Sequence, residues 1–241
     1  MDHIDDTARR VAGLLFVAGA VLLLGGNLVH PVDADPTELS RLDLAGGIDW
    51  IAIHLVIAVG MLAVTIGLAL FAGVVRERAE PAATVLAVVA VIGGTLMTTV
   101  FAVLDGYAMS TVAESWQGAG TDARASLEVT ARTLDAIDTG LAGLGTLLLM
   151  GVAMVALGAC LVHAEVGRRW LRILPFAVGA GGAATGVTML VSGASDLAIN
   201  VLLRPTAAGM TILVLALGIT LRRSPARADA TALRGPRVPA A

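Results

Sequence analysis

Six long apolar segments alternate with short polar segments along the chain. They cover residues 11–30, 50–75, 81–104, 139–163, 171–191 and 197–221. Each has about 20 or more residues, which is the length that an α-helix needs to cross the roughly 30 Å hydrocarbon core of a bilayer. Weak alternation and many glycines argue against membrane β-strands, which are shorter and alternate with a period of two. The pattern predicts an all-α, polytopic membrane protein, a bundle of six transmembrane helices.

The polar segments divide the chain into three parts. We expect a short N-terminal segment at residues 1–10, a transmembrane domain over residues 11–221 and a tail over residues 222–241. The tail is rich in Pro, Ala and Arg without periodicity, which is typical of a disordered segment. Residues 122–137 are polar with helical spacing, so we expect them either to continue the fourth helix or to lie on the membrane surface.

The composition supports this class of protein. Hydrophobic residues make up 57% of the chain and charged residues only 15%, whereas about a quarter of the residues in soluble domains are charged. The single cysteine excludes an internal disulfide and a metal site built from several cysteines. The chain contains no nucleotide, coenzyme or nucleic-acid motif, so the expected partner is the lipid bilayer.

The arginines predict an orientation. If the N-terminus lies in the cytoplasm, twelve of the sixteen arginines fall in cytoplasmic segments, and Arg41, Arg124, Arg132 and Arg204 fall outside. This agrees with the excess of basic residues found in cytoplasmic loops. We therefore expect both termini in the cytoplasm and a location in the inner, or plasma, membrane. Trp50 is expected at the outer boundary as an interfacial aromatic residue.

Ionisable side chains gather at the predicted outer ends of the helices. They are His30, His54, Asp105, Asp135, Asp138 and Arg204. Polar groups below the lipid headgroups are costly, so they usually face the bundle interior and have partners. We expect them to form an outer-leaflet polar pocket that binds a small ligand, an ion or a lipid, with Arg204 facing a lipid phosphate.

Two other functions fit the same residues. His30 and His54 could hold zinc or heme in a membrane enzyme or electron carrier, with the aspartates as further ligands or orienting groups. No H-E-x-x-H or G-x-S-x-G motif is present, so no catalytic residue is assigned. The third function is a small transporter that dimerises through faces such as Gly182-x-x-x-Gly186, although such glycines more often pack helices within one chain.

Structural roles compete with these functions. His30, followed by Pro31, would mark the water boundary at the end of the first helix. A buried His54 would more commonly bond to a neighbouring helix than bind a ligand. Asp105 before Gly106 is typical of a helix end and a turn.

The remaining acidic and basic residues also have structural interpretations. Asp135 and Asp138 would solvate the first turn of the fourth membrane-spanning segment, where acids also complement the helix dipole. Arg204 would form a structural ion pair, with Asp196 or Asp138 as the partner.

Three strings give the chain a recognisable layout. They are "GNLVHP" at the end of the first segment, "DWIAIHL" at the start of the second and "LDGYA" after the third. Over most of residues 9–221 this layout resembles small multi-pass membrane proteins of high-GC prokaryotes. The resemblance implies that the six segments form one unit, and it implies no particular activity.

Overall fold

The structure is a computed structural model that describes residues 2–30, 45, 49–77 and 79–223. Its α-helices are α1 (Asp2–Val29), α3 (Trp50–Val75), α4 (Pro81–Val103), α5 (Met109–Gln117), α6 (Thr121–Thr146), α7 (Ala153–His163), α8 (Arg169–Ser192) and α9 (Arg204–Arg223). Three π-helical segments are η1 (Leu104–Ala108), η2 (Leu147–Val152) and η3 (Leu197–Leu203). The expected tail, residues 222–241, lies outside the described residues after Arg223.

The π-helical segments join neighbouring α-helices into continuous rods, so the described chain forms six helices that are long and apolar enough to cross a membrane. This confirms the prediction of an all-helical chain with six apolar helices. The rods are Asp6–Val29, Trp50–Val75, Pro81–Gln117, Thr121–His163, Arg169–Ser192 and Leu197–Arg223. The second has the bounds that the hydrophobic pattern predicted.

The third rod does not end at Asp105 and Gly106, and that prediction is wrong. The helix widens there into η1, where the Met109 N–H donates to the Leu104 carbonyl, five residues back. A π-turn of this kind takes up an extra residue without ending the helix. Both Asp105 and Gly106 are buried, so this glycine serves close packing and not a turn.

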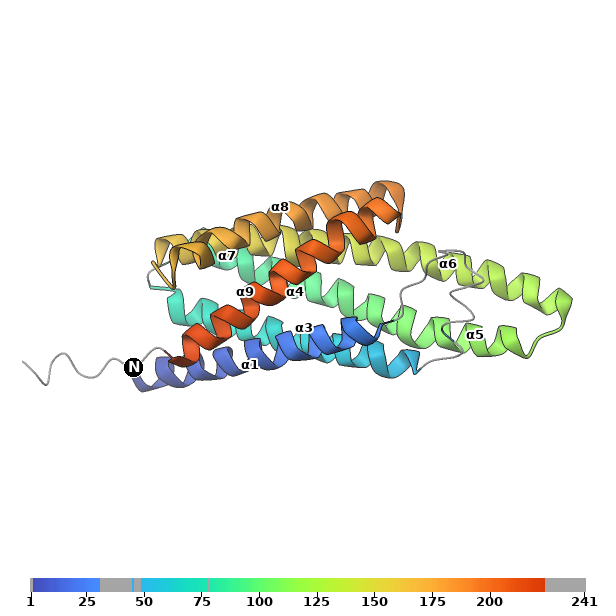
Figure 1. The fold of residues 1–241 in the computed structure, drawn as a ribbon, viewed down its shortest axis with the longest axis horizontal. Helices are drawn as coiled ribbons and strands as arrows, with labels where there is room; N and C mark the ends of the chain where they lie inside the picture. The colour runs from blue at the N-terminus through green and yellow to red at the C-terminus, as the bar shows by residue number, and fades with distance from the viewer. Residues whose placement is uncertain (1, 31–44, 46–48, 78, 224–241) are drawn as a thin grey trace, which may run out of the picture.

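The third and fourth rods form a hairpin that is longer than the rest of the bundle. They have 37 and 43 residues, which corresponds to about 55 and 65 Å at the helical rise. Residues 122–137 continue the fourth helix, the first of the two arrangements expected for them. α5 and the start of α6 therefore project past the ends of the other helices (Figure 1).

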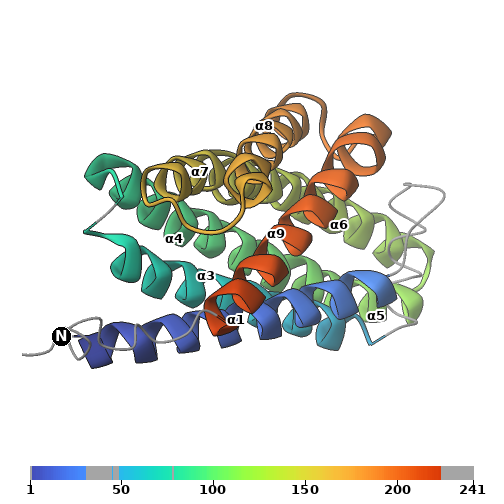
Figure 2. The ribbon, with the colours of Figure 1, turned by 60° about the vertical axis from the view of Figure 1, so that its left-hand side comes forward.

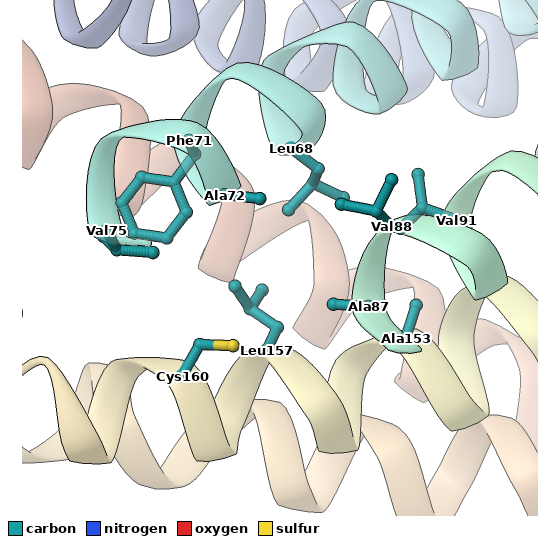
Figure 3. Close-up of a pocket in the computed structure, with 10 residues that line it drawn as sticks. All are labelled: Leu68, Phe71, Ala72, Val75, Ala87, Val88, Val91, Ala153, Leu157 and Cys160. Atoms are coloured by element: carbon teal, nitrogen blue, oxygen red, sulfur yellow. The ribbon is translucent and has the colours of Figure 1, made fainter. Parts of the chain in front are cut away.

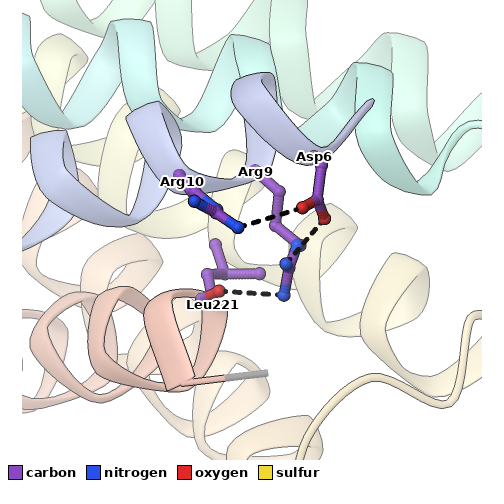
Figure 4. Close-up of polar contacts among 4 residues, drawn as sticks. All are labelled: Asp6, Arg9, Arg10 and Leu221. Atoms are coloured by element: carbon purple, nitrogen blue, oxygen red, sulfur yellow. Dashed lines mark hydrogen bonds and ion pairs between the residues drawn. The ribbon is translucent and has the colours of Figure 1, made fainter. Parts of the chain in front are cut away.

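The N-terminal part of α1 and the end of α9 meet at the other end of the bundle. α9 runs obliquely across the bundle and packs on α1 (Figure 1 and Figure 2). Arg9 Nη1 donates to the Leu221 carbonyl at 3.1 Å, and both Arg9 and Arg10 pair with Asp6 (Figure 4). The carbonyls of a last helical turn lack partners within the helix, so Arg9 caps α9.

This end is rich in arginine, and we term it the arginine-rich end. Beside Arg9 and Arg10 it holds the described arginines of the α3–α4 connection, of the α7–α8 connection and the start of α8, and of the end of α9: Arg76, Arg168, Arg169, Arg172, Arg222 and Arg223.

The apolar core between the helices leaves little free space. A cavity among Leu68, Ala87, Leu157 and Cys160 is lined by apolar side chains (Figure 3). Its volume of about 10 Å³ is near the minimum that holds one water molecule. It is a packing void, and Cys160 is buried within the core around it.

Glycines bring α8 into backbone contact with the fourth rod. A Cβ atom on Gly182 would lie 2.4 Å from the Met150 carbonyl carbon, and one on Gly186 would lie 2.7 Å from the Gly143 oxygen. Such close approach is how small residues associate helices in lipid. The Gly182-x-x-x-Gly186 face is therefore used inside the chain, which is the intramolecular packing that its sequence favoured.

We predict that Gly182→Ala destabilises the bundle by about 1–3 kcal/mol, because the added methyl meets backbone atoms that have no rotamer to change. The measurement is the thermal unfolding temperature of the purified protein in detergent. Gly25→Ala is the matched control, because no atom lies within 4 Å of a Cβ built there. Equal effects of the two substitutions would contradict the packing described for α8.

Candidate functional site

Two histidines and an aspartate from three rods meet at the end opposite the arginine-rich end. His30 follows the last turn of α1, His54 lies one turn into α3, and Asp105 lies in η1. The side chains of His54 and Asp105 are buried, with 2% and 3% of the residue exposed, and His30 is partly exposed. We term these three residues the histidine–aspartate centre.

The start of α3 sets the position of His54. Asp49 caps this helix by accepting a hydrogen bond from the Ala52 N–H at 3.2 Å, which is the common role of an aspartate at a helix start. The helix therefore begins at Trp50. Trp50 and His54, four residues apart, lie on the same face and point toward η1.

Hydrogen bonds join α3 to η1 within the centre. The Trp50 indole Nε1 donates to the backbone carbonyl of Asp105 at 2.6 Å, and His54 Nε2 lies 2.9 Å from Asp105 Oδ2. His54 Nδ1 lies 2.8 Å from the Trp50 carbonyl oxygen, to which it donates. Because all these groups are buried, each bond satisfies polar atoms that water does not reach.

Gly106 allows the two rods to come this close. A Cβ atom at this position would lie 2.7 Å from the Cβ of His54. Any larger residue would push α3 away from η1 and separate His54 from Asp105. The sequence motif "LDGYA" is thus explained by contact with a neighbouring helix.

The rings of the centre pack on one another. The His30 ring centroid lies 5.1 Å from those of both His54 and Trp50. One ligand atom from each of His30, His54 and Asp105 can be chosen so that all three lie within 4.8 Å of one another. The centre can therefore hold a metal ion, but it does not fit heme. Axial histidines bind heme iron from opposite faces of a macrocycle, and the contact between these two rings leaves no room for one.

Asp138 lies at the level of the centre on the fourth rod. Leu149 packs on Gly94, and Gly145 on Thr98. The same antiparallel register places Asp138 level with Asp105. Asp138 is only 2% exposed and lies in the interior of α6.

This burial contradicts the expectation that Asp138 solvates a first helical turn, because the helix begins at Thr121. Asp135, one turn earlier, is half-buried.

Arg204 does not join the centre. It is exposed at the start of α9, and η3 just before it packs mainly on α8. Among the described residues, the expected ion pair of Arg204 with Asp196 or Asp138 is not formed. Asp196 Oδ1 instead accepts a hydrogen bond from the Asn200 side chain at 2.6 Å.

Sequence reasoning missed Trp50 as a member of the site. It was expected only as an interfacial aromatic residue, but it is 3% exposed and bonded to Asp105. The spacing W-x-x-x-H, which places a tryptophan and a histidine on one helix face, was the available signal.

A second hollow lies at the turn between α5 and α6, and its polar groups have structural roles. The Arg124 guanidinium lies 4.5 Å from the centre of the Trp116 ring and donates to the carbonyls of Trp116 and Ala119. Arg124 therefore caps the end of α5. The hollow is a consequence of this tight connection.

The fold and the centre together define a class: a helical bundle with six helices of membrane-spanning length and a buried histidine–aspartate centre near one end. No protein-family model, curated protein or solved structure matches the chain. The functional assignment therefore depends on the chemistry of the centre.

We predict that Trp50→Phe lowers the free energy of unfolding by about 1–3 kcal/mol, because the buried Asp105 carbonyl loses its indole donor. Denaturant or thermal unfolding in detergent measures this change. Trp170→Phe is the control, since Trp170 is 45% exposed. An equal loss of stability in Trp170→Phe and Trp50→Phe would contradict the structural role of the Trp50 hydrogen bond.

Proposed function

We propose that this chain is an integral protein of the inner, or plasma, membrane, with both termini in the cytoplasm, and that its outward-facing histidine–aspartate centre binds a small cation. The arginine distribution supports the orientation, because the arginine-rich end holds eight of the eleven arginines among the described residues and basic residues favour the cytoplasmic side. The centre then lies near the outer boundary of the hydrocarbon.

The contact between His54 and Asp105 is the observation that carries the cation-binding role. A backbone carbonyl can only accept, so His54 Nδ1 must carry the hydrogen that it shares with Trp50. In the neutral ring, Nε2 then presents a lone pair to Asp105 Oδ2 at 2.9 Å. Two acceptors at this distance repel each other in a buried site, so the pair must either share a proton, as in the hydrogen bond described above, or hold another cation in its place. This contact supports the proposal that a small cation can take the place of the proton between the two side chains.

The surrounding charges also favour a cation over an anionic lipid headgroup. A second buried carboxylate, Asp138, lies at the level of Asp105. Arg204, the arginine expected to face a lipid phosphate, is exposed and lies near α8. A phosphate at the centre would therefore meet carboxylates without the help of that arginine.

A purely structural role for the contact explains less of the arrangement. A hydrogen bond that only tied α3 to η1 would need no third polar ring. The His30 ring nevertheless lies 5.1 Å from that of His54 and brings a third possible ligand to the pair. Convergence of three rods on one point is typical of a binding site in a helical bundle.

The orientation predicts the result of reporter fusions. Fusions at Arg76, in the turn after α3, and after Arg223 should both report the cytoplasm, because an even number of crossings separates them. A fusion at Gly118, in the turn between α5 and α6, should report the outer side. If the Arg76 and Arg223 fusions report opposite sides, the six-crossing topology is wrong.

Cation binding predicts stabilisation of the folded chain. A cation that binds only the folded state should raise the unfolding temperature, by the equivalent of about 2.7 kcal/mol at a concentration 100 times its Kd. The purified protein would be heated with NaCl, MgCl₂, CaCl₂ or ZnCl₂, and in parallel with sodium phosphate or anionic-lipid vesicles.

Asp105→Asn should abolish the stabilisation, and Asp196→Asn, an exposed site at the same end, should retain it. Stabilisation by phosphate or anionic lipid alone would contradict the proposal.

A further inference from the structure

We infer that the cation is a divalent transition-metal ion of the first row, held by His30, His54 and Asp105. This inference rests on the proposed cation-binding function and names the class of cation. It draws on the types of donor in the centre, their spacing and the hydrogen bonds that orient them.

The donor set selects the class of metal. Imidazole nitrogen suits zinc, iron, copper and nickel, whereas calcium and magnesium are bound by oxygen ligands. Two histidines and one carboxylate form the ligand set of several zinc enzymes and of non-heme iron(II) sites. The centre supplies this set from side chains far apart in the sequence, on α1, α3 and η1.

The spacing of the donors needs only a small adjustment. Ligand atoms around a four-coordinate zinc ion lie about 3.3 Å apart, given bonds of about 2.0–2.1 Å. His54 Nε2 and Asp105 Oδ2 are already 2.9 Å apart, and all three ligand atoms lie within 4.8 Å of one another. The largest shift falls on His30, which is partly exposed and follows the last turn of its helix.

The orientation of His54 matches that of a metal ligand. Metal-binding histidines almost always donate their second ring N–H to a carbonyl or carboxylate, which fixes the ring and its tautomer. His54 Nδ1 makes this bond to the Trp50 carbonyl, so the lone pair of Nε2 is directed at the centre.

His163 provides an internal comparison. Its Nδ1 lies 2.9 Å from the Ala159 carbonyl, also four residues back, but the side chain is exposed at the arginine-rich end. The backbone bond alone therefore does not identify a ligand. What distinguishes His54 is that its second ring nitrogen lies beside a buried carboxylate and that another imidazole packs on its ring.

Three protein ligands leave at least one coordination position for water or a substrate. Closed structural zinc sites use four protein ligands, whereas sites at which zinc acts on a substrate use three. Within the part of the chain that the structure describes, the inferred site therefore has the three protein ligands of an open site.

Zinc titration of the full-length chain in detergent tests the inference. After removal of bound metal with a chelator, ZnCl₂ is added in a calorimeter, and one ion per chain should bind. His54→Ala and His30→Ala should each weaken binding by more than the roughly 10- to 100-fold that loss of an outer-shell partner costs. His163→Ala should leave the affinity unchanged, and excess MgCl₂ should not displace zinc.

His30→Ala keeps the test valid if His54→Ala does not fold, because His30 is partly exposed. Zinc binding that is unchanged in the folded histidine variants, or equal competition by magnesium, overturns the transition-metal inference and leaves the cation-binding proposal standing. Absence of stabilisation or binding by every cation tested removes both.

Discussion

The burial of Asp105 in an apolar bundle determines how the three rods of the histidine–aspartate centre pack. A carboxylate away from water must find its partners within the protein. Asp105 finds them on α3, where His54 meets its side chain and the Trp50 indole meets its backbone carbonyl. These contacts bring three rods to one point, because the His30 ring packs on both residues of α3.

The same contact explains the unusual shape of the third rod. Gly106 permits α3 to approach, and the π-turn η1 continues the helix past the point of contact. The helix therefore extends through α5, turns and returns as α6, giving the long hairpin of Figure 1. Trp50 also packs with Met109 and Ala131 in a small second core, so one residue links the centre to the hairpin.

Sequence alone predicted how far along each helix the polar residues lie, but not where they lie around the bundle. Six apolar runs gave the six rods, and their ends placed His30, His54 and Asp105 at one level. Arg204 was placed at that level too, but the segment just before it packs mainly on α8 and not on the rods of the centre. The position of a rod around the bundle depends on helix packing, which the hydrophobic periodicity does not encode. Gly106 was interpreted as a turn because sequence does not distinguish a turn glycine from one that meets a neighbouring helix.

X-ray absorption by the zinc-loaded protein would test most directly whether the three rods share one metal ion. A metal ion held by His30, His54 and Asp105 should have nitrogen and oxygen neighbours at about 2.0–2.1 Å, with outer scattering from two imidazole rings. A shell of oxygen atoms without imidazole scattering would contradict a shared site. A sulfur neighbour at about 2.3 Å from the metal, which would come from the single cysteine, would also contradict it.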